Sequence, residues 1–136
     1  MAEYSWVTLR FKSVDEELVG QVEDEFGHHD EFFTEDGWTV IGGDRSFGLI
    51  EVIEEMLIEA GVEYHRYSDG KYEYDGDEAH WWPGLERPRV FQMLNNGGRV
   101  FSENEYLAVK DKSDAELAAL IREHFEFGAD REEVKA

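Results

Sequence analysis

The sequence predicts a single α+β domain in which two or three helices cover one face of a mainly antiparallel sheet of about six strands. Two observations support this prediction. The spacing of apolar residues changes repeatedly between a period of two, typical of strands, and steps of three and four, typical of helices. Taken in order, these patterns predict β-α-β-α-β-β-β-β-α, and consecutive strands pair most readily as antiparallel hairpins. A ferredoxin-like arrangement of the first half fits this order, as do other two-layer folds.

The N-terminal residues predict a strand followed by a helix. Residues 4–11 alternate between two kinds of side chain with the period of a strand. Ser13 and Glu16 have the spacing of a capping box, in which a hydroxyl and a carboxylate satisfy the first free amides of a helix. Gly27 is placed to end this helix, whose apolar stripe consists of Val14, Leu18, Val22 and Phe26.

A second helix is predicted after a loop and a short strand. The polar stretch over residues 28–37 is typical of a loop, and residues 38–41 of a short strand that ends at a glycine pair. The helix is expected from about Ser46 to Ala60, with Gly61 as its stop signal. One of its sides carries carboxylates, and the other is apolar, with Leu49, Ile50, Ile53, Met56 and Leu57.

Two hairpins are predicted in the second half. Residues 62–67 and 71–76 flank the turn sequence Ser68-Asp69-Gly70. A loop with the two adjacent tryptophans connects this hairpin to the next one, which consists of residues 89–94 and 99–109. Arginines occur around the second hairpin, and if they lie opposite the acidic helices the molecule is strongly dipolar; they are Arg87, Arg89 and Arg99.

The last predicted element is a helix that starts with a second capping box, formed by Ser113 and Glu116. Its apolar side consists of Leu117, Leu120, Ile121, His124 and Phe125. No repeat or linker divides the chain, so we expect one domain over residues 1–127. We expect residues 128–136 to form a frayed acidic and polar tail.

Composition excludes several classes of function. The chain has 136 residues, of which 41% are hydrophobic, enough to build one core. It has no cysteine, which removes disulfides, thiolate catalysis and cysteine-bound zinc. No apolar run approaches the roughly 18 residues that span a bilayer, and the N-terminus lacks a signal-peptide pattern, so we expect a cytoplasmic protein. The net charge of −20 disfavours direct binding to nucleic acid or anionic membranes and favours a basic partner.

Most of this charge lies in the first half of the chain. Residues 1–60 contain 16 acidic and 3 basic residues, whereas residues 91–136 contain 10 and 6. Both helices predicted there lack the bases that ordinarily alternate with carboxylates on a surface helix. Carboxylates at steps of four recur about every 6 Å, close to the spacing of phosphates along a nucleic-acid strand. We therefore expect a partner-binding acidic face formed by Glu16, Glu17, Glu23, Asp24, Glu51, Glu54, Glu55 and Glu59.

Four aromatic residues are candidate apolar anchors for the same partner, because tyrosine and tryptophan are enriched at binding hot spots. They are Tyr64, Tyr67, Trp81 and Trp82. Adjacent residues of a strand point to opposite sides, so one of Trp81 and Trp82 is expected to be partly exposed. The alternative for these tryptophans is a plug at the end of a small sheet.

Histidines and carboxylates also occur together in two short stretches. These are His28-His29-Asp30 and the residues from Asp75 to His80. Neither stretch has the spacing of a known zinc or calcium site. No nucleophile motif or phosphate-binding loop is present either. We therefore expect no metal site, no cofactor and no catalytic residue.

Together these observations predict a non-enzymatic inhibitor that occludes the basic nucleic-acid-binding surface of a partner protein by mimicking nucleic acid. Phage or plasmid anti-defence proteins, such as anti-CRISPR or anti-restriction inhibitors, use this chemistry. An immunity protein that neutralises a cognate nuclease toxin is the alternative within the same class. In another class, the charge fits an acid-adapted housekeeping or enzymatic domain from a high-salt cytoplasm. Taken singly, either acidic helix is more typical of a solvated surface than of a binding site.

Overall fold

The computed structural model describes residues 4–69, 76–94, 98–129 and 131 of the chain. In these residues six antiparallel strands form one sheet with four helices around it, which confirms the α+β class. None of the described helices combines the length and the apolar character needed to cross a membrane. The elements are β1 (Tyr4–Lys12), α1 (Glu16–Phe26), β2 (Glu31–Glu35), β3 (Trp38–Ser46), α2 (Phe47–Glu59), β4 (Tyr64–Ser68), β5 (Asp77–Trp81), β6 (Arg89–Gln92), α3 (Glu103–Val109) and α4 (Asp114–Glu126).

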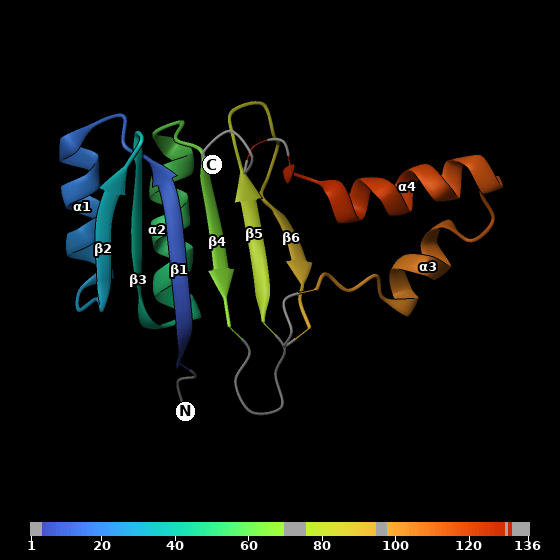
Figure 1. The fold of residues 1–136 in the computed structure, drawn as a ribbon, viewed down its shortest axis with the longest axis horizontal. Helices are drawn as coiled ribbons and strands as arrows, with labels where there is room; N and C mark the ends of the chain where they lie inside the picture. The colour runs from blue at the N-terminus through green and yellow to red at the C-terminus, as the bar shows by residue number, and fades with distance from the viewer. Residues whose placement is uncertain (1–3, 70–75, 95–97, 130, 132–136) are drawn as a thin grey trace.

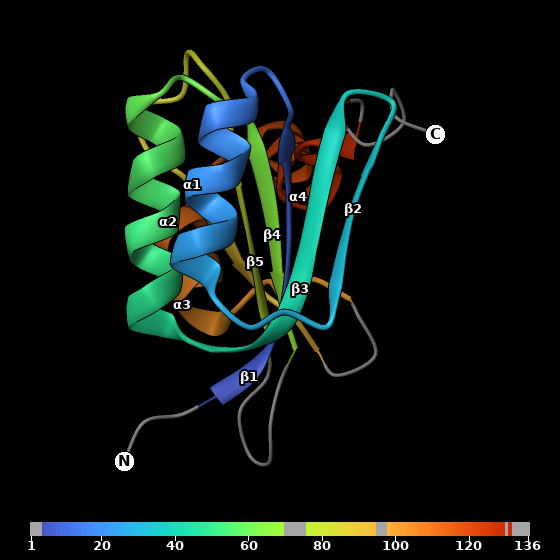
Figure 2. The same cartoon turned by 90° about the vertical axis from the view of Figure 1, so that its left-hand side faces the viewer.

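The strands lie in the order β2-β3-β1-β4-β5-β6, and each is antiparallel to its neighbours. Elements β1 to β4 with α1 and α2 therefore have the split β-α-β arrangement of ferredoxin-like domains, one of the two-layer folds that the sequence allows. Helices α1 and α2 lie side by side on one face of the sheet, as Figure 2 shows. Strands β5 and β6 extend the sheet on the side of β4, and α3 and α4 follow beyond β6 (Figure 1).

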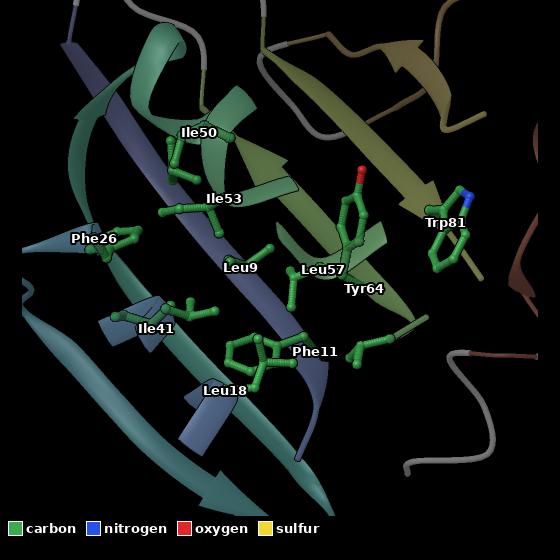
Figure 3. Packing of buried hydrophobic residues seen from close by; sticks show 13 residues of the cluster. Leu9, Phe11, Leu18, Phe26, Ile41, Ile50, Ile53, Leu57, Tyr64 and Trp81 are labelled. Atoms are coloured by element: carbon green, nitrogen blue, oxygen red, sulfur yellow. The ribbon is translucent and has the colours of Figure 1, made fainter. Parts of the chain in front are cut away.

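The strand register assigns each side chain to one of two faces. Leu9 on β1 lies opposite Ile41 on β3 and Arg66 on β4, and this set faces α1 and α2. Their neighbours along the strands, such as Arg10 and His65, point to the opposite face. The core lies between the first face and the two helices (Figure 3) and consists of Val7, Leu9, Phe11, Leu18, Val22, Phe26, Ile41, Ile50, Ile53, Leu57, Val62, Tyr64 and Trp81.

The loop predicted over residues 28–37 contains a strand instead. Strand β2 pairs with β3, although all five of its side chains are exposed and Phe33 retains 43% of its surface. An edge strand of this kind is held by main-chain hydrogen bonds rather than by burial of its side chains. Its sequence therefore lacks the apolar alternation that predicts a strand. Strand β3 also continues past residue 41, because Gly42 and Gly43 still pair with β1.

The predicted capping box at the start of the first helix is wrong as well. Asp15 caps α1, and its carboxylate accepts a hydrogen bond from the amide of Glu17 at 2.9 Å. The hydroxyl of Ser13 is instead hydrogen-bonded to Thr39 of β3. Val14 consequently lies outside the helix and is exposed, whereas the other three residues of its stripe are buried. Gly27 ends the helix with a φ of 78°, as predicted.

In the second half, the first hairpin is formed by β4 and β5. Its second strand is β5, which starts at Asp77; residues 71–75 of the predicted strand lie outside the described residues. Trp81 ends β5 and is not part of a loop.

For the second predicted hairpin, the first strand is confirmed as β6, but the prediction of a second strand over residues 99–109 is wrong. Among the residues described there, an isolated bridge joins Met93 to Arg99 after β6, and the chain then forms helix α3. Ser102 and Glu105 make a complete capping box there, which overrides the strand-like pattern of residues 99–109. The final helix, α4, is capped by Ser113 as predicted, but His124 is the only buried residue along it. Of the predicted tail, Arg131 donates a hydrogen bond to Glu63 at 2.8 Å.

Candidate protein-binding surface

Helices α1 and α2 together present a strongly acidic surface. The two helices contain nine acidic residues and no lysine, arginine or histidine. Their apolar stripes face the sheet, so most of the carboxylates lie on the outer side. We call this surface the acidic layer; it consists of the half-buried Glu23 and the exposed residues Glu16, Glu17, Asp24, Glu25, Glu51, Glu55 and Glu59.

One carboxylate of α2 does not belong to this layer. Glu54 accepts a hydrogen bond at 2.5 Å from Arg66, whose guanidinium is buried and also contacts Asp77 at 2.7 Å. Burial lowers the pKa of Arg66, but the two carboxylates outweigh this effect and raise it, so the guanidinium stays charged. Glu54 is therefore neutralised beneath the helix, which corrects its assignment to the outer face.

The four aromatic candidates do not share a face with the acidic layer. Tyr64 is 0% exposed and Trp81 6% exposed, so both belong to the core and cannot anchor a partner. Burial, together with the charge of Glu54, raises the pKa of Tyr64 far above its ordinary value. Trp82 is half-buried, as expected for one of the two tryptophans, and stacks on Phe127 with ring centroids 5.0 Å apart. Tyr67, also half-buried, lies like Trp82 on the sheet face opposite the helices.

This opposite face contains a row of buried polar groups that no sequence pattern identifies as a unit, although Glu78 and His80 lie in one of the histidine stretches. His65 Nε2 lies 2.9 Å from Glu63, and its Nδ1 lies 2.7 Å from His80 Nδ1. Beyond His80, Glu78 is bonded to Arg99, and each lies 3.3 Å from His80 Nε2. We call these five residues the polar row. Both histidines at its centre are 0% exposed.

The polar row fastens the C-terminal end of α4 to the sheet. Arg99 donates hydrogen bonds to the main-chain oxygens of His124 and Phe127, at 2.7 and 2.8 Å. Burial raises the pKa of Glu78, but its hydrogen bonds and charge interactions with His80 and Arg99 outweigh this and hold it below its ordinary value. Every polar group of the row thus has a partner, which indicates a structural role.

A sequence signal for this row does exist. Glu63 and His65 are separated by one residue, and so are Glu78 and His80. In a strand this spacing places both members of each pair on the same face. The strands β4 and β5 then pair with His65 directly opposite His80. Only the register, which is a tertiary property, brings the two histidines together.

The arginines of the second half lie away from the acidic layer. Arg89 is opposite His80 and therefore projects from the face that α1 and α2 leave uncovered. It pairs with Glu123 of α4 at 2.8 Å, and this hydrogen bond lowers the pKa of Glu123. Arg99 contacts the same face through His80. Arg89 and Arg99 thus lie on the side away from the acidic layer, where each is paired with a carboxylate, that of Glu123 and that of Glu78 respectively.

The same face contains a buried arginine, Arg10, whose guanidinium lies against an aromatic ring. Arg10 is only 3% exposed, and its guanidinium lies 4.2 Å from the ring centre of Trp38. None of its three nitrogen atoms has a hydrogen-bond partner among the described residues. Its contact with the aromatic ring is a cation–π interaction of about 1 to 2 kcal/mol when desolvated.

The two histidine stretches noted in the sequence lie within the described residues except for Asp75. In the described part of the chain, no group of three or more histidine, aspartate or glutamate side chains could hold a metal ion. His29 instead pairs with Glu23 at 3.0 Å, and His28 lies 3.5 Å from Asp30. No protein-family model matches the chain, and no curated protein or solved structure is significantly similar to it.

Proposed function

We propose that the protein is a non-enzymatic binding protein whose acidic layer occupies the basic nucleic-acid-binding surface of a partner protein. One observation carries this proposal: two adjacent helices present eight carboxylates of the acidic layer and contain no basic residue. A surface helix that serves only solubility ordinarily alternates acids with bases, because such pairs stabilise it. Two neighbouring helices without a base lose that stabilisation, which is consistent with selection for binding.

The geometry of α2 supports the role of a nucleic-acid mimic. Glu51, Glu55 and Glu59 are exposed and follow one another at intervals of four residues. This corresponds to about 6 Å of rise per step, similar to the spacing of phosphates along a strand. A basic groove that binds this row releases its own counterions, as it does when it binds nucleic acid, and long-range attraction speeds the encounter.

Two biological settings use such a surface, and the proposal covers both. In the first, a phage or plasmid inhibitor blocks a host defence enzyme, as anti-CRISPR and anti-restriction proteins do, in the cytoplasm of the host. In the second, an immunity protein neutralises a nuclease toxin encoded beside it. The genes next to this one distinguish the two settings, because phage genes favour the first and a toxin gene the second.

The test of the proposal is reversal of charge on α2. The variant Glu51→Lys/Glu55→Lys/Glu59→Lys is compared with Glu31→Lys/Glu35→Lys/Glu86→Lys, which makes the same change in net charge at exposed positions outside the layer. The wild-type protein and the control variant are expected to capture nucleic-acid-binding proteins from a host lysate, and short duplex DNA is expected to displace them. The α2 variant is expected to lose this capture. Equal capture by both variants would refute the proposal.

A salt series separates this function from that of a domain adapted to a saline cytoplasm. Surface repulsion is screened within a few Å at molar salt, so the melting temperature of a binding protein should rise only slightly from low to high salt. A salt-adapted domain instead requires salt to fold. Unfolding of the wild-type protein below about 0.5 M salt therefore favours the second class.

A further inference from the structure

Helices α3 and α4 form an arm that extends beyond β6, away from α1 and α2 (Figure 1). The structure describes every residue of both helices, and α3 has no buried residue while α4 has only His124. Large apolar side chains of the arm are between 36% and 49% exposed; they are Tyr106, Leu107, Leu120, Ile121 and Phe125. Several exposed large apolar side chains on two successive helices are typical of a binding site.

Contacts with the sheet hold only the base of the arm. His124 Nε2 lies 2.8 Å from the main-chain oxygen of Val100, and Glu123 accepts two hydrogen bonds from Arg89. The helices themselves are 7 and 13 residues long. Helices this short gain most of their stability from an apolar side packed against another element. The apolar side of the arm lacks that cover within the described chain, so a partner molecule would complete it.

The two helices enclose a groove of about 250 Å³. Its apolar lining consists of Phe101, Ala108, Val109 and Leu120. The charged residues at the same groove are Glu105, Glu123 and Arg89; Arg89 is paired with Glu123, whereas Glu105 remains 44% exposed although it lies 3.3 Å from His124. The groove therefore combines an apolar floor with one exposed carboxylate, that of Glu105, at its side, an arrangement that accommodates an apolar side chain from a basic segment.

Charge selects the class of partner. Residues 101–126 contain seven acidic and three basic residues, so the surroundings of the apolar patch are negative. A second copy of the chain carries the same sign, with a net charge of −20, and would be repelled. A segment with lysine or arginine beside its apolar residues is attracted instead.

We infer that the α3–α4 arm is a docking surface for a basic amphipathic helix of a partner protein. The apolar side of that helix occupies the groove and covers Leu120, Ile121 and Phe125, and its basic residues face the carboxylates of the arm. The inference rests on the proposed function in one respect, because it assigns a second contact to the same basic partner. The acidic layer attracts that partner, and the arm adds apolar contact area.

The test uses a synthetic amphipathic helix of leucine and lysine as the probe, labelled for fluorescence anisotropy. Two control peptides accompany it: one with glutamate in place of lysine, and one of the same composition without helical periodicity. The variant Leu120→Glu/Ile121→Glu is compared with Val52→Glu, since Val52 is an equally exposed apolar residue on α2. Circular dichroism checks folding, and Ile121→Gln serves if the double variant unfolds.

The expected result is saturable binding of the leucine-lysine peptide alone, at least tenfold weaker for the arm variant and unchanged for Val52→Glu. Three results would overturn the inference: absence of saturable binding, equal affinity of the arm variant and the wild type, or a dimer of the wild-type protein that the arm variant loses. If the arm variant binds normally while Glu51→Lys/Glu55→Lys/Glu59→Lys does not, the peptide occupies the acidic layer. The inference then fails while the proposed function stands.

Discussion

His65 Nδ1 and His80 Nδ1 lie 2.7 Å apart at the centre of the buried polar row. At this distance one proton fits between the two nitrogens, because two N–H groups cannot point at each other. The Nε2 atoms have different partners: Glu63 accepts from His65, while His80 faces both Glu78 and Arg99. The two imidazoles therefore form one hydrogen-bonded unit that joins β4 to β5 below the end of α4.

The first prediction concerns the protons of this unit. At neutral pH one of the two Nδ1 atoms is expected to carry a proton and the other to accept it, with His65 also protonated on Nε2 beside Glu63. Long-range ¹H–¹⁵N spectra of histidine-labelled protein distinguish these states. Identical Nε2-protonated tautomers for both residues, which place no proton between the Nδ1 atoms, would contradict the geometry.

The second prediction concerns Glu78 and acid stability. Because the folded state holds the pKa of Glu78 below its ordinary value, its stabilising contribution is complete above the unfolded carboxyl pKa of about 4.3 and is lost as pH falls through the folded pKa. The variant Glu78→Gln should therefore be less stable than wild type at pH 7, and the difference should shrink below about pH 4. Urea unfolding at a series of pH values measures it. A difference that is constant with pH would assign the effect to packing alone.

The third prediction concerns the ion pair beneath α2. Replacing Arg66 with methionine leaves Glu54 and Asp77 without their buried cation. We expect the free energy of unfolding to fall by about 3 to 5 kcal/mol, the usual effect of removing one partner of a buried pair. Arg122→Met on the exposed surface of α4 is the matched control, with an expected change within about 0.5 kcal/mol. Similar effects of the two substitutions in urea unfolding would show that the pair under α2 is not buried in solution.

The fourth prediction is that a different buried arginine can be replaced without a large loss of stability. Arg10 is as buried as Arg66, but its guanidinium has no hydrogen-bond acceptor among the described residues. Arg10→Met removes a desolvated charge and the contact with Trp38, while no hydrogen bond is broken. We therefore expect the free energy of unfolding to stay within about 1 kcal/mol of wild type or to rise. A loss above about 3 kcal/mol would identify a carboxylate that pairs with Arg10 in solution.

The sequence by itself determines the local features of this protein. The four-residue spacing of Leu18, Val22 and Phe26 places the carboxylates of α1 on its outer side, and Gly27 ends that helix. On α2 the spacing likewise places Glu51, Glu55 and Glu59 on the outer side. Ser113 starts α4 as its capping sequence indicates. These features depend on residues within one or two turns of each other, so periodicity and capping chemistry are sufficient to predict them.

Only the tertiary structure decides which of the charged and aromatic residues remain at the surface. Glu54 and Glu55 are adjacent acidic residues of α2, yet the carboxylate of Glu54 pairs with Arg66, which lies on strand β4 beneath the helix. Tyr64 and Trp81 are buried because their strands pair in a register that places both under the helices. The same register brings His65 to His80. Strand register joins residues far apart in the chain and depends on the packing of whole faces, so local patterns cannot specify it.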